Sequence, residues 1–243
     1  MLAYLLIATS VSLVTSAVLG VRLLRLARRS GELPELLMGV SFLVAGVVGY
    51  VLTIVGRPDA EGVPANVAAI CFAAGYAAIS AGVVLTYVFN WMVFHRRSRI
   101  AAAATGVASL LVAATVVPMV NARIAHTPPD TLDWIGNVAR MGSGVWGAWV
   151  ALMHAQRLRR RVALDLADPA LANRFLLWAF TMAATFVIFL ATSLAVGPHA
   201  SRMSAAHIAL ISTLTLAAAV AQWLAFFPPR GYLRWIRGVR AVA

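Results

Sequence analysis

Seven apolar stretches divide the chain, and each is long enough to cross a lipid bilayer as a helix. About 20 helical residues span the roughly 30 Å hydrocarbon core of a bilayer. The stretches cover residues 2–24, 36–55, 67–93, 100–120, 134–154, 175–196 and 205–227. Because a soluble core cannot bury this much apolar surface, the sequence predicts an all-α fold: a polytopic membrane protein built as a seven-transmembrane-helix bundle.

The composition leaves little room for a separate soluble domain. The 243 residues are 62% hydrophobic and 12% charged, whereas about 25% of the residues in soluble domains are charged. We therefore expect one membrane domain over residues 1–229 and a cytoplasmic tail over residues 230–243. Rows of small residues such as Ser41, Ala45 and Gly49 favour close packing of helices within this domain, and they would also allow a homodimer.

The arginines predict the orientation of the bundle. All twenty Lys and Arg positions are arginines, and sixteen of them lie on the first, third and fifth connections and on the tail. The opposite side carries Arg57, Arg123 and Arg202, while Arg140 lies inside a span. Because basic residues accumulate on the cytoplasmic side, the N-terminus is predicted outside and the C-terminus inside. The wealth of arginine and alanine favours a GC-rich bacterial genome, and hence a multi-pass protein of the bacterial cytoplasmic (inner) membrane.

The tail has the pattern of a short amphipathic helix. On a helix that starts after Pro229, one sector is basic and another is apolar. The basic sector holds Arg230, Arg234, Arg237 and Arg240, and the apolar sector holds Tyr232, Trp235, Ile236 and Val239. The pattern predicts a C-terminal amphipathic interfacial helix on the inner leaflet, with its arginines facing anionic lipid headgroups.

Residue content disfavours several classes of function. Without a lysine, the chain cannot bind retinal through a Schiff base. All eight acidic residues lie at predicted helix ends or in loops, whereas proton pumps and cation-coupled transporters usually carry a carboxylate inside the membrane. The arginines cluster at helix ends and form no soluble basic face, so we expect no nucleic-acid partner.

We also expect no catalytic residues and no cofactor. The sequence contains no phosphate loop, dinucleotide fingerprint or CxxC pair, and Gly142-Ser143-Gly144 lacks the pattern of rhomboid proteases. On the outer side, His126, His199 and His207 have no neighbouring carboxylate and no helical spacing that favours a metal site. On the inner side, His95 and His154 share a depth, but their arginine neighbours indicate headgroup contacts and not haem ligation.

Arg140 is the residue that most suggests a binding site. It lies about two turns inside the fifth span from its outer end, where a charge is costly and usually has a partner or lines a cavity. Asn137 and Asp133 lie toward the outer end of the same helix and Trp146 lies deeper. We interpret these four residues as an outward-facing pocket in which Arg140 binds a carboxylate or an anionic headgroup. Alternatively, Arg140 extends outward to Asp133, Asp130 or Glu61, or bonds to exposed main-chain carbonyls.

The predicted topology resembles the layout of rhodopsins and G-protein-coupled receptors. Seven spans, an outer N-terminus and an amphipathic eighth helix carry the resemblance over the whole chain. The motifs of those proteins are absent, since the position after the third span reads Phe94-His95-Arg96 and the last span holds no Asn-Pro-x-x-Tyr. The resemblance is therefore one of layout, and we assign the chain to no family from it.

Three functional hypotheses follow. The leading one is a non-enzymatic, receptor-like sensor or accessory subunit that binds a small apolar or anionic amphiphilic ligand from the outer side. As a sensor, it would need a separate membrane or cytoplasmic partner. The alternative is a facilitative transporter or exporter, in which the first three helices repeat as the last three around a linking fourth helix. The further alternative is a haem or quinone electron carrier.

Overall fold

The computed structural model describes residues 2–57, 62–125, 127, 130–195 and 204–238, and its regular elements are all helices. They are α1 (Leu2–Ser30), α2 (Leu33–Leu43), the π-helical turn η1 (Val44–Gly49), α3 (Tyr50–Val55), α4 (Ala65–Phe94), α5 (Arg99–Ala114), α6 (Val116–Ile124), α7 (Thr131–Ala163), α8 (Pro169–Ala195), α9 (Ala205–Phe226) and α10 (Arg230–Gly238). The all-α prediction is confirmed for this part of the chain. Residues Asp59, Glu61, His126, His199, Arg202, Val239 and Arg240, which entered the sequence analysis, lie outside it.

Six helical segments of the described chain are long and apolar enough to cross a membrane. They are Ala3–Ser30, Leu33–Val55, Ala65–Phe94, Arg99–Ala122, Pro169–Leu194 and Ala205–Phe226. These segments coincide with six of the seven predicted spans, as a multi-pass membrane protein requires. The remaining predicted span lies in α7, where glycines, tryptophans, Asn137 and Arg140 lower the apolar content. Length and composition therefore support six membrane crossings in the described chain. A seventh crossing, by α7, has to be argued from other features.

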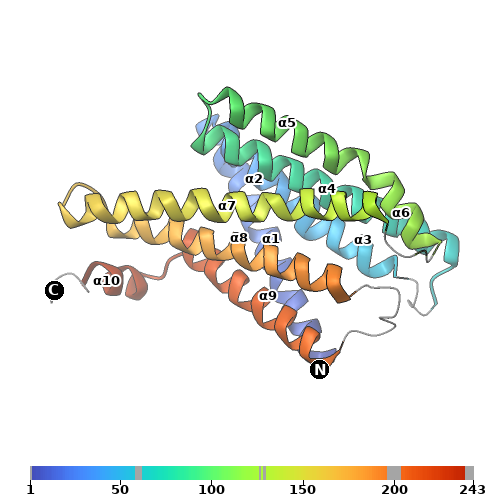
Figure 1. The fold of residues 1–243 in the computed structure, drawn as a ribbon. Helices are drawn as coiled ribbons and strands as arrows, with labels where there is room; N and C mark the ends of the chain where they lie inside the picture. Colours follow the sequence, from blue (N-terminus) through green and yellow to red (C-terminus); the bar gives the residue numbers. More distant parts are fainter. Residues whose placement is uncertain (1, 58–61, 126, 128–129, 196–203, 239–243) are drawn as a thin grey trace.

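The helices pack as a closed ring with one pair outside it. Neighbouring contacts run from α1 to α2, from α2 and α3 to α4, from α4 to α7, and then through α8 and α9 back to α1. The α5–α6 pair packs against α4 and α7 on the outside of this ring. Figure 1 shows α7 running along the bundle between α4 and α8, with the start of α1 and the whole of α10 at opposite ends.

Apolar side chains cover the outer surface of the ring as well as its interior. Leu6, Ile70, Leu110 and Val138 come from four different helices and are 58% to 71% exposed. The interior holds a cluster around Leu19, Met38, Trp178 and Met182, among others. A soluble protein rarely exposes apolar surface this widely, whereas lipid chains cover such a surface without penalty.

Two of the membrane-length segments are not regular α-helices. In the second, η1 joins α2 to α3 with a widened turn. In the fourth, α5 ends at Ala114 and α6 begins at Val116, where the sequence predicted one span over residues 100–120. Pro118 explains this break, because proline has no N–H to donate to the Ala114 carbonyl and its ring crowds that turn.

Glycines bring α3 and its flanking turn close to α4. A Cβ atom added at Gly75 would lie 2.7 Å from the Thr53 amide nitrogen and 2.8 Å from the Gly49 carbonyl oxygen. A Cβ atom added at Gly49 would lie 2.8 Å from Ile79. The backbones of these two helices therefore approach as closely as small residues in membrane helices allow, as the Ser41, Ala45, Gly49 row predicted.

Two polar contacts attach α10 to the start of α8. Arg237 Nη2 donates a hydrogen bond to Asp168 Oδ2 at 3.0 Å, and Asn173 Nδ2 donates one to the Tyr232 hydroxyl at 2.8 Å. Asp168 also caps α8, because its Oδ1 accepts a bond from the Ala170 amide at 2.9 Å. The Ala170 bond and then the Arg237 bond lower the pKa of Asp168 below its ordinary value of 3.8, since both favour the ionised carboxylate.

Gly75→Ala should destabilise the protein. The new methyl group would press on backbone atoms of α3 and η1 that cannot rotate away, and overpacking of this kind costs about 1–3 kcal/mol. The readout is the melting temperature of the purified protein in detergent. Gly106→Ala is the matched control, because a Cβ atom at Gly106 would meet nothing within 4 Å. Equal melting temperatures for the two variants would contradict the close packing of α3 on α4.

Arg237→Gln should loosen α10 while Arg234→Gln should not. Exposed ion pairs contribute about 1 kcal/mol or less, so amide exchange in α10 should rise about two- to fivefold at neutral pH. Because folding lowers the pKa of Asp168, the wild-type contact is fully present above pH 3.8 and is lost as the pH falls through the lowered value. Hydrogen–deuterium exchange, corrected for intrinsic rates, measures both effects. Identical exchange in the two variants would exclude the ion pair as the attachment.

Candidate functional site

Arg140 lies fully inside the protein. Its side chain projects from the first third of α7 into the junction with α4 and the α5–α6 pair, and it is 2% exposed. It is the largest of the fully buried side chains in the described part of the chain. The prediction that this arginine is an unusual buried charge is thus matched by its position, but water and lipid headgroups are excluded from it in this arrangement.

Protein atoms satisfy every nitrogen of the Arg140 guanidinium. Nε and Nη2 donate hydrogen bonds to the Ser80 hydroxyl at 3.2 and 3.1 Å, and Nη2 also donates to the Val112 carbonyl at 3.1 Å. Nη1 donates to the Thr115 hydroxyl at 3.1 Å and to the Met119 sulfur at 3.3 Å. The group also stacks over the ring of Tyr76, 4.8 Å from its centroid. These contacts involve all five N–H donors that an arginine has.

The partners from the α5–α6 pair lie at the helix break. The Val112 carbonyl accepts from Arg140 Nη2 at 3.1 Å and from the Thr115 hydroxyl at 3.3 Å. Thr115 stands at the break, and its hydroxyl donates to the Leu111 carbonyl at 2.8 Å while accepting from Arg140. Gly136 supplies the room, because a Cβ atom there would lie 2.7 Å from Arg140 Nη1.

All the hydrogen-bond acceptors around Arg140 are electrically neutral. They are two hydroxyls, one carbonyl and one thioether. The ion pair between Arg237 and Asp168 is distant from this site. A buried cation ordinarily has a carboxylate beside it, because an unneutralised charge in a low-dielectric interior is costly. The site therefore has its hydrogen bonds satisfied by neutral groups, and the Asp133 carboxylate acts on the guanidinium only through space.

Asp133 lies seven residues before Arg140, about 10 Å along the helix axis. It is 5% exposed and forms a reciprocal cap at the start of α7 with Asp130. Asp133 Oδ2 accepts from the Asp130 amide at 3.1 Å, and Asp130 Oδ1 accepts from the Asp133 amide at 2.9 Å. Asp133 Oδ1 is buried without a hydrogen-bond partner in the described structure. The expected extension of Arg140 to these acids is thus replaced by a cap, and one carboxylate oxygen is left for another donor.

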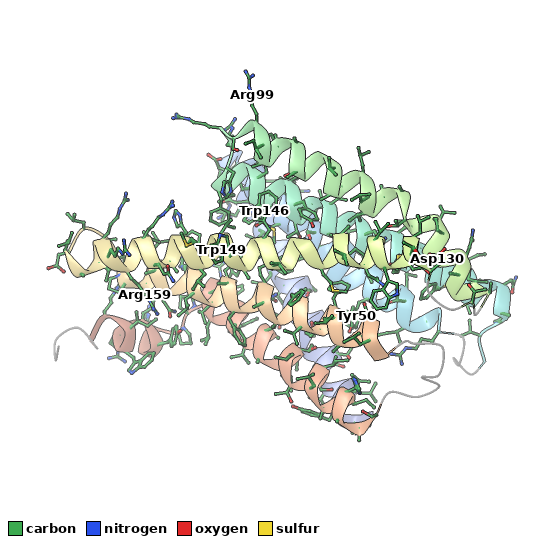
Figure 2. The ribbon with its side chains drawn as sticks, in the orientation of Figure 1. Tyr50, Arg99, Asp130, Trp146, Trp149 and Arg159 are labelled. Carbon is green, nitrogen blue, oxygen red and sulfur yellow. The ribbon has the colours of Figure 1, made fainter. Side chains whose placement is uncertain are left out.

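The other two predicted site residues lie apart from the guanidinium. Asn137 is half-buried and supplies none of the hydrogen bonds to Arg140. Trp146 lies 13 residues beyond Asp133, about 20 Å along the helix, and packs against the rings of Tyr87 and His95, each at 5.9 Å. Figure 2 shows Asp130 at one end of α7 and Trp146 well along it. The four predicted residues therefore do not form one compact pocket.

Trp146 borders an apolar groove on the outward face of α7. The groove has a volume of about 430 Å³ and runs past Val138, Met141 and Val145 to Trp146 and Trp149, with Phe186 of α8 on its other side. Its floor is close to the Tyr87 hydroxyl, which donates to the Ala139 carbonyl at 2.6 Å. The groove offers contact to a hydrocarbon chain, whereas Arg140 faces the interior.

The partners of Arg140 were missed by the sequence analysis, although part of the signal was present. Pro118 inside an apolar span predicts a helix break and an unpaired carbonyl one turn earlier. Ser80 and Thr115 are small hydroxyl residues in other spans, and nothing in the linear order indicates that they meet Arg140. The interpretation in which Arg140 bonds to exposed main-chain carbonyls came closest, since it includes the Val112 bond.

The histidines at the arginine-rich end lie against aromatic rings. His154 packs on Phe175 at 4.5 Å and on Phe94 at 5.8 Å between ring centroids, while His95 packs on Trp146. No group of three His, Cys, Asp or Glu residues in the described chain is arranged to hold a metal ion. Of the three histidines predicted on the outer side, His207 is the one in the described part of the chain, and it bonds to the N-cap residue Ser204 of α9.

Comparison with known proteins gives no match to a family model, to a curated protein or to a solved structure.

Ser80→Ala should destabilise the protein through Arg140. The substitution removes the oxygen that accepts from two guanidinium nitrogens, and hydrogen bonds to charged groups contribute about 1.5–3 kcal/mol. The melting temperature in detergent should fall accordingly. Ser143→Ala is the control, because among the described residues the buried Ser143 hydroxyl bonds to the carbonyl of Arg140 on its own helix, and its loss should matter less.

A double-substitution cycle isolates the pairing between Ser80 and Arg140. In an Arg140→Met background no guanidinium remains, so Ser80→Ala should cost much less than in the wild type. An equal loss of stability in both backgrounds would show that Ser80 acts independently of the arginine.

Proposed function

We propose that this chain is a non-enzymatic seven-helix protein of the bacterial inner membrane that binds a small anionic amphiphile at Arg140 from the outer side. In this proposal it acts as a receptor-like sensor or as an accessory subunit. The observation that carries the proposal is a buried cation with neutral hydrogen-bond partners. Such a site attracts a carboxylate or phosphate that can neutralise it, and it offers little to a cation or to a neutral sugar.

The seven-helix topology rests on α7 as a further crossing. This helix follows the length of the bundle, and α1 begins at one end while α10 lies at the other (Figure 1). An odd number of crossings accounts for this arrangement. Arg99 and Arg159 lie toward the α10 end and Asp130 toward the opposite end (Figure 2). The excess of arginines at the α10 end favours a cytoplasmic location for that end and an outer location for the N-terminus.

Ligand binding would change the hydrogen bonds by which Arg140 connects α7 to the α5–α6 pair. Charge-assisted hydrogen bonds are shorter than neutral ones and roughly twice as strong. An anionic oxygen would therefore compete with Thr115 and the Val112 carbonyl for the guanidinium. Because these acceptors lie at the α5–α6 break, their release would let that pair of helices shift against α4 and α7. A ligand that bonds to Arg140 in only one of two arrangements shifts the population toward that arrangement.

The remaining predicted site residues take secondary roles in this proposal. Asp133 Oδ1 has no partner in the described structure and would accept from a hydroxyl or amine of the ligand. Asn137 lies between Asp133 and Arg140 and adds a polar contact. Trp146 borders a separate groove on the outward face of α7, and in this proposal it makes no contact with the ligand at Arg140.

The tail, with α10, lies on the inner leaflet in this proposal. Its arginines would contact anionic headgroups, and its attachment to α8 through Asp168 would keep it beside the bundle. A sensor of this kind passes its response to a separate membrane or cytoplasmic partner.

Photolabelling with decanoate that carries a diazirine tests the proposal. In nanodiscs the probe should label α7 near Asn137, and excess decanoate should suppress this labelling while decanol should not. Arg140→Gln should abolish it because the amide carries no charge. Arg57→Gln should retain it, since Arg57 is an exposed arginine at the same end of the bundle. Peptide mapping by mass spectrometry gives the position of the label.

Two outcomes would contradict the proposal. One is labelling of α7 that is equal in Arg140→Gln and wild type, and the other is equal competition by decanol and decanoate. Competition in the wild type is informative even where Arg140→Gln fails to fold. Protein-dependent uptake of decanoate into proteoliposomes would instead favour the facilitative transporter.

A further inference from the structure

A second cavity lies inside the helix ring at the arginine-rich end of the bundle. Its volume is about 360 Å³, and side chains of α1, α2, α4, α8 and α9 line it. Binding sites for small molecules commonly have volumes of about 300–1,000 Å³. The cavity shares no lining residue with the Arg140 site. From its lining we propose that it binds a single-chain amphiphile with an anionic head, such as a fatty acid or a lysophospholipid.

The charged residues of the cavity favour an anion. Arg22 comes from the last third of α1, Glu35 from the start of α2 and Arg174 from the start of α8. Arg22 donates to the Phe226 carbonyl at 2.9 Å, and its guanidinium lies 4.0 Å above the centre of the Phe227 ring. The Glu35 carboxylate accepts from the Ser30 hydroxyl. Two guanidinium groups and one carboxylate give the cavity a net positive charge.

Arg174 is available to bind a ligand head. In the described structure it makes no hydrogen bond or ion pair with another side chain, and it is exposed. Its planar guanidinium can hold a carboxylate or phosphate through two parallel hydrogen bonds. Arg22, by contrast, is fixed in place by its bond to α9 and by the Phe227 ring. The pair therefore combines one guanidinium that is held by protein groups and one that is exposed.

The inner wall of the cavity is apolar. Leu19, Leu23 and Met38 are buried, with exposed fractions of 0%, 6% and 5%, and Phe89 packs against the same cluster. These side chains belong to three different helices, so a hydrocarbon chain between them would contact α1, α2 and α4 together. Burial of such a chain stabilises the complex through the hydrophobic effect wherever water otherwise fills the space.

Trp178 adds an unused hydrogen-bond donor to this wall. Its indole is 7% exposed and packs edge-on against Phe42 and Phe226. The indole Nε1 is buried and has no partner among the described residues. Trp178 follows Arg174 by one helical turn on the same face of α8, so its N–H and the guanidinium can reach the same head group. A buried donor without an acceptor is unfavourable, and an oxygen of the ligand would satisfy it.

The volume of the cavity limits how many hydrocarbon chains of a ligand it can hold. Its volume of about 360 Å³ is near the lower end of the range for small-molecule sites, which suits one chain. The charge selects the head, because a neutral alcohol gains nothing from Arg22 and Arg174. This inference does not rest on ligand binding at Arg140, since the two sites involve different residues on different faces of the bundle.

Binding of radiolabelled palmitate to the delipidated protein in nanodiscs tests the inference. The wild type should bind one palmitate per chain at this site. Arg174→Glu should weaken binding by about tenfold or more, because it replaces an attractive charge with a repulsive one. Arg159→Glu is the matched control, since Arg159 is an exposed arginine at the same end but outside the cavity. Trp178→Phe keeps the ring, removes only the N–H, and should weaken binding severalfold.

Two comparisons identify the source and the class of the ligand. Lysophosphatidylglycerol and palmitate, each competing with the label, distinguish a membrane lipid fragment from a free fatty acid, and preferential binding of either supports the site. Equal competition by hexadecanol, or full binding by Arg174→Glu, would overturn the inference. Arg140→Gln should bind palmitate like the wild type, so failure at one site is distinguishable from failure at the other.

Discussion

The junction of α4, α5–α6 and α7 depends on the solvation of one buried cation by the protein itself. Inside a bilayer no water is available for the five N–H donors of Arg140, so each must find an oxygen or sulfur on a neighbouring helix. Ser80, Thr115 and the Val112 carbonyl meet this need from two directions. Separating any of the three helices would leave a charged donor unpaired, and this requirement fixes their relative positions more strictly than apolar contacts can.

The positions of the helices follow from the sequence because they depend on length and apolar content. Six predicted spans coincide with membrane-length segments. The seventh predicted span, in α7, rests on a different argument. The spacing of the arginine clusters argued for it, whereas the apolar content of α7 does not. The residues that lower the apolar content of α7 include Asn137 and Arg140, which are also the residues from which a binding site in α7 was predicted.

The site was only partly predictable because its partners come from distant parts of the chain. Ser80 is 60 residues from Arg140 and Thr115 is 25 residues from it, and only packing decides that they meet. A second reason is that a nearby backbone amide competes with Arg140 for the Asp133 carboxylate. Asp133 was a reasonable partner for Arg140 by distance along the helix, but its carboxylate is three residues from an uncapped amide and closes a capping box instead. Trp146 was placed on a plausible face and is too far along the helix to share a pocket with Asp133.

The widened turn η1 has a consequence for the relation between sequence and surface in the second span. A π-turn accommodates one more residue than an α-turn, and one residue corresponds to about 100° of rotation. The side chains of α3 are therefore rotated with respect to the phase that α2 establishes, so a single helical wheel drawn through residues 33–55 would misplace the side chains of α3. The apolar second segment therefore consists of two helices with different surroundings: α2 packs against both α1 and α4, and α3 packs against α4.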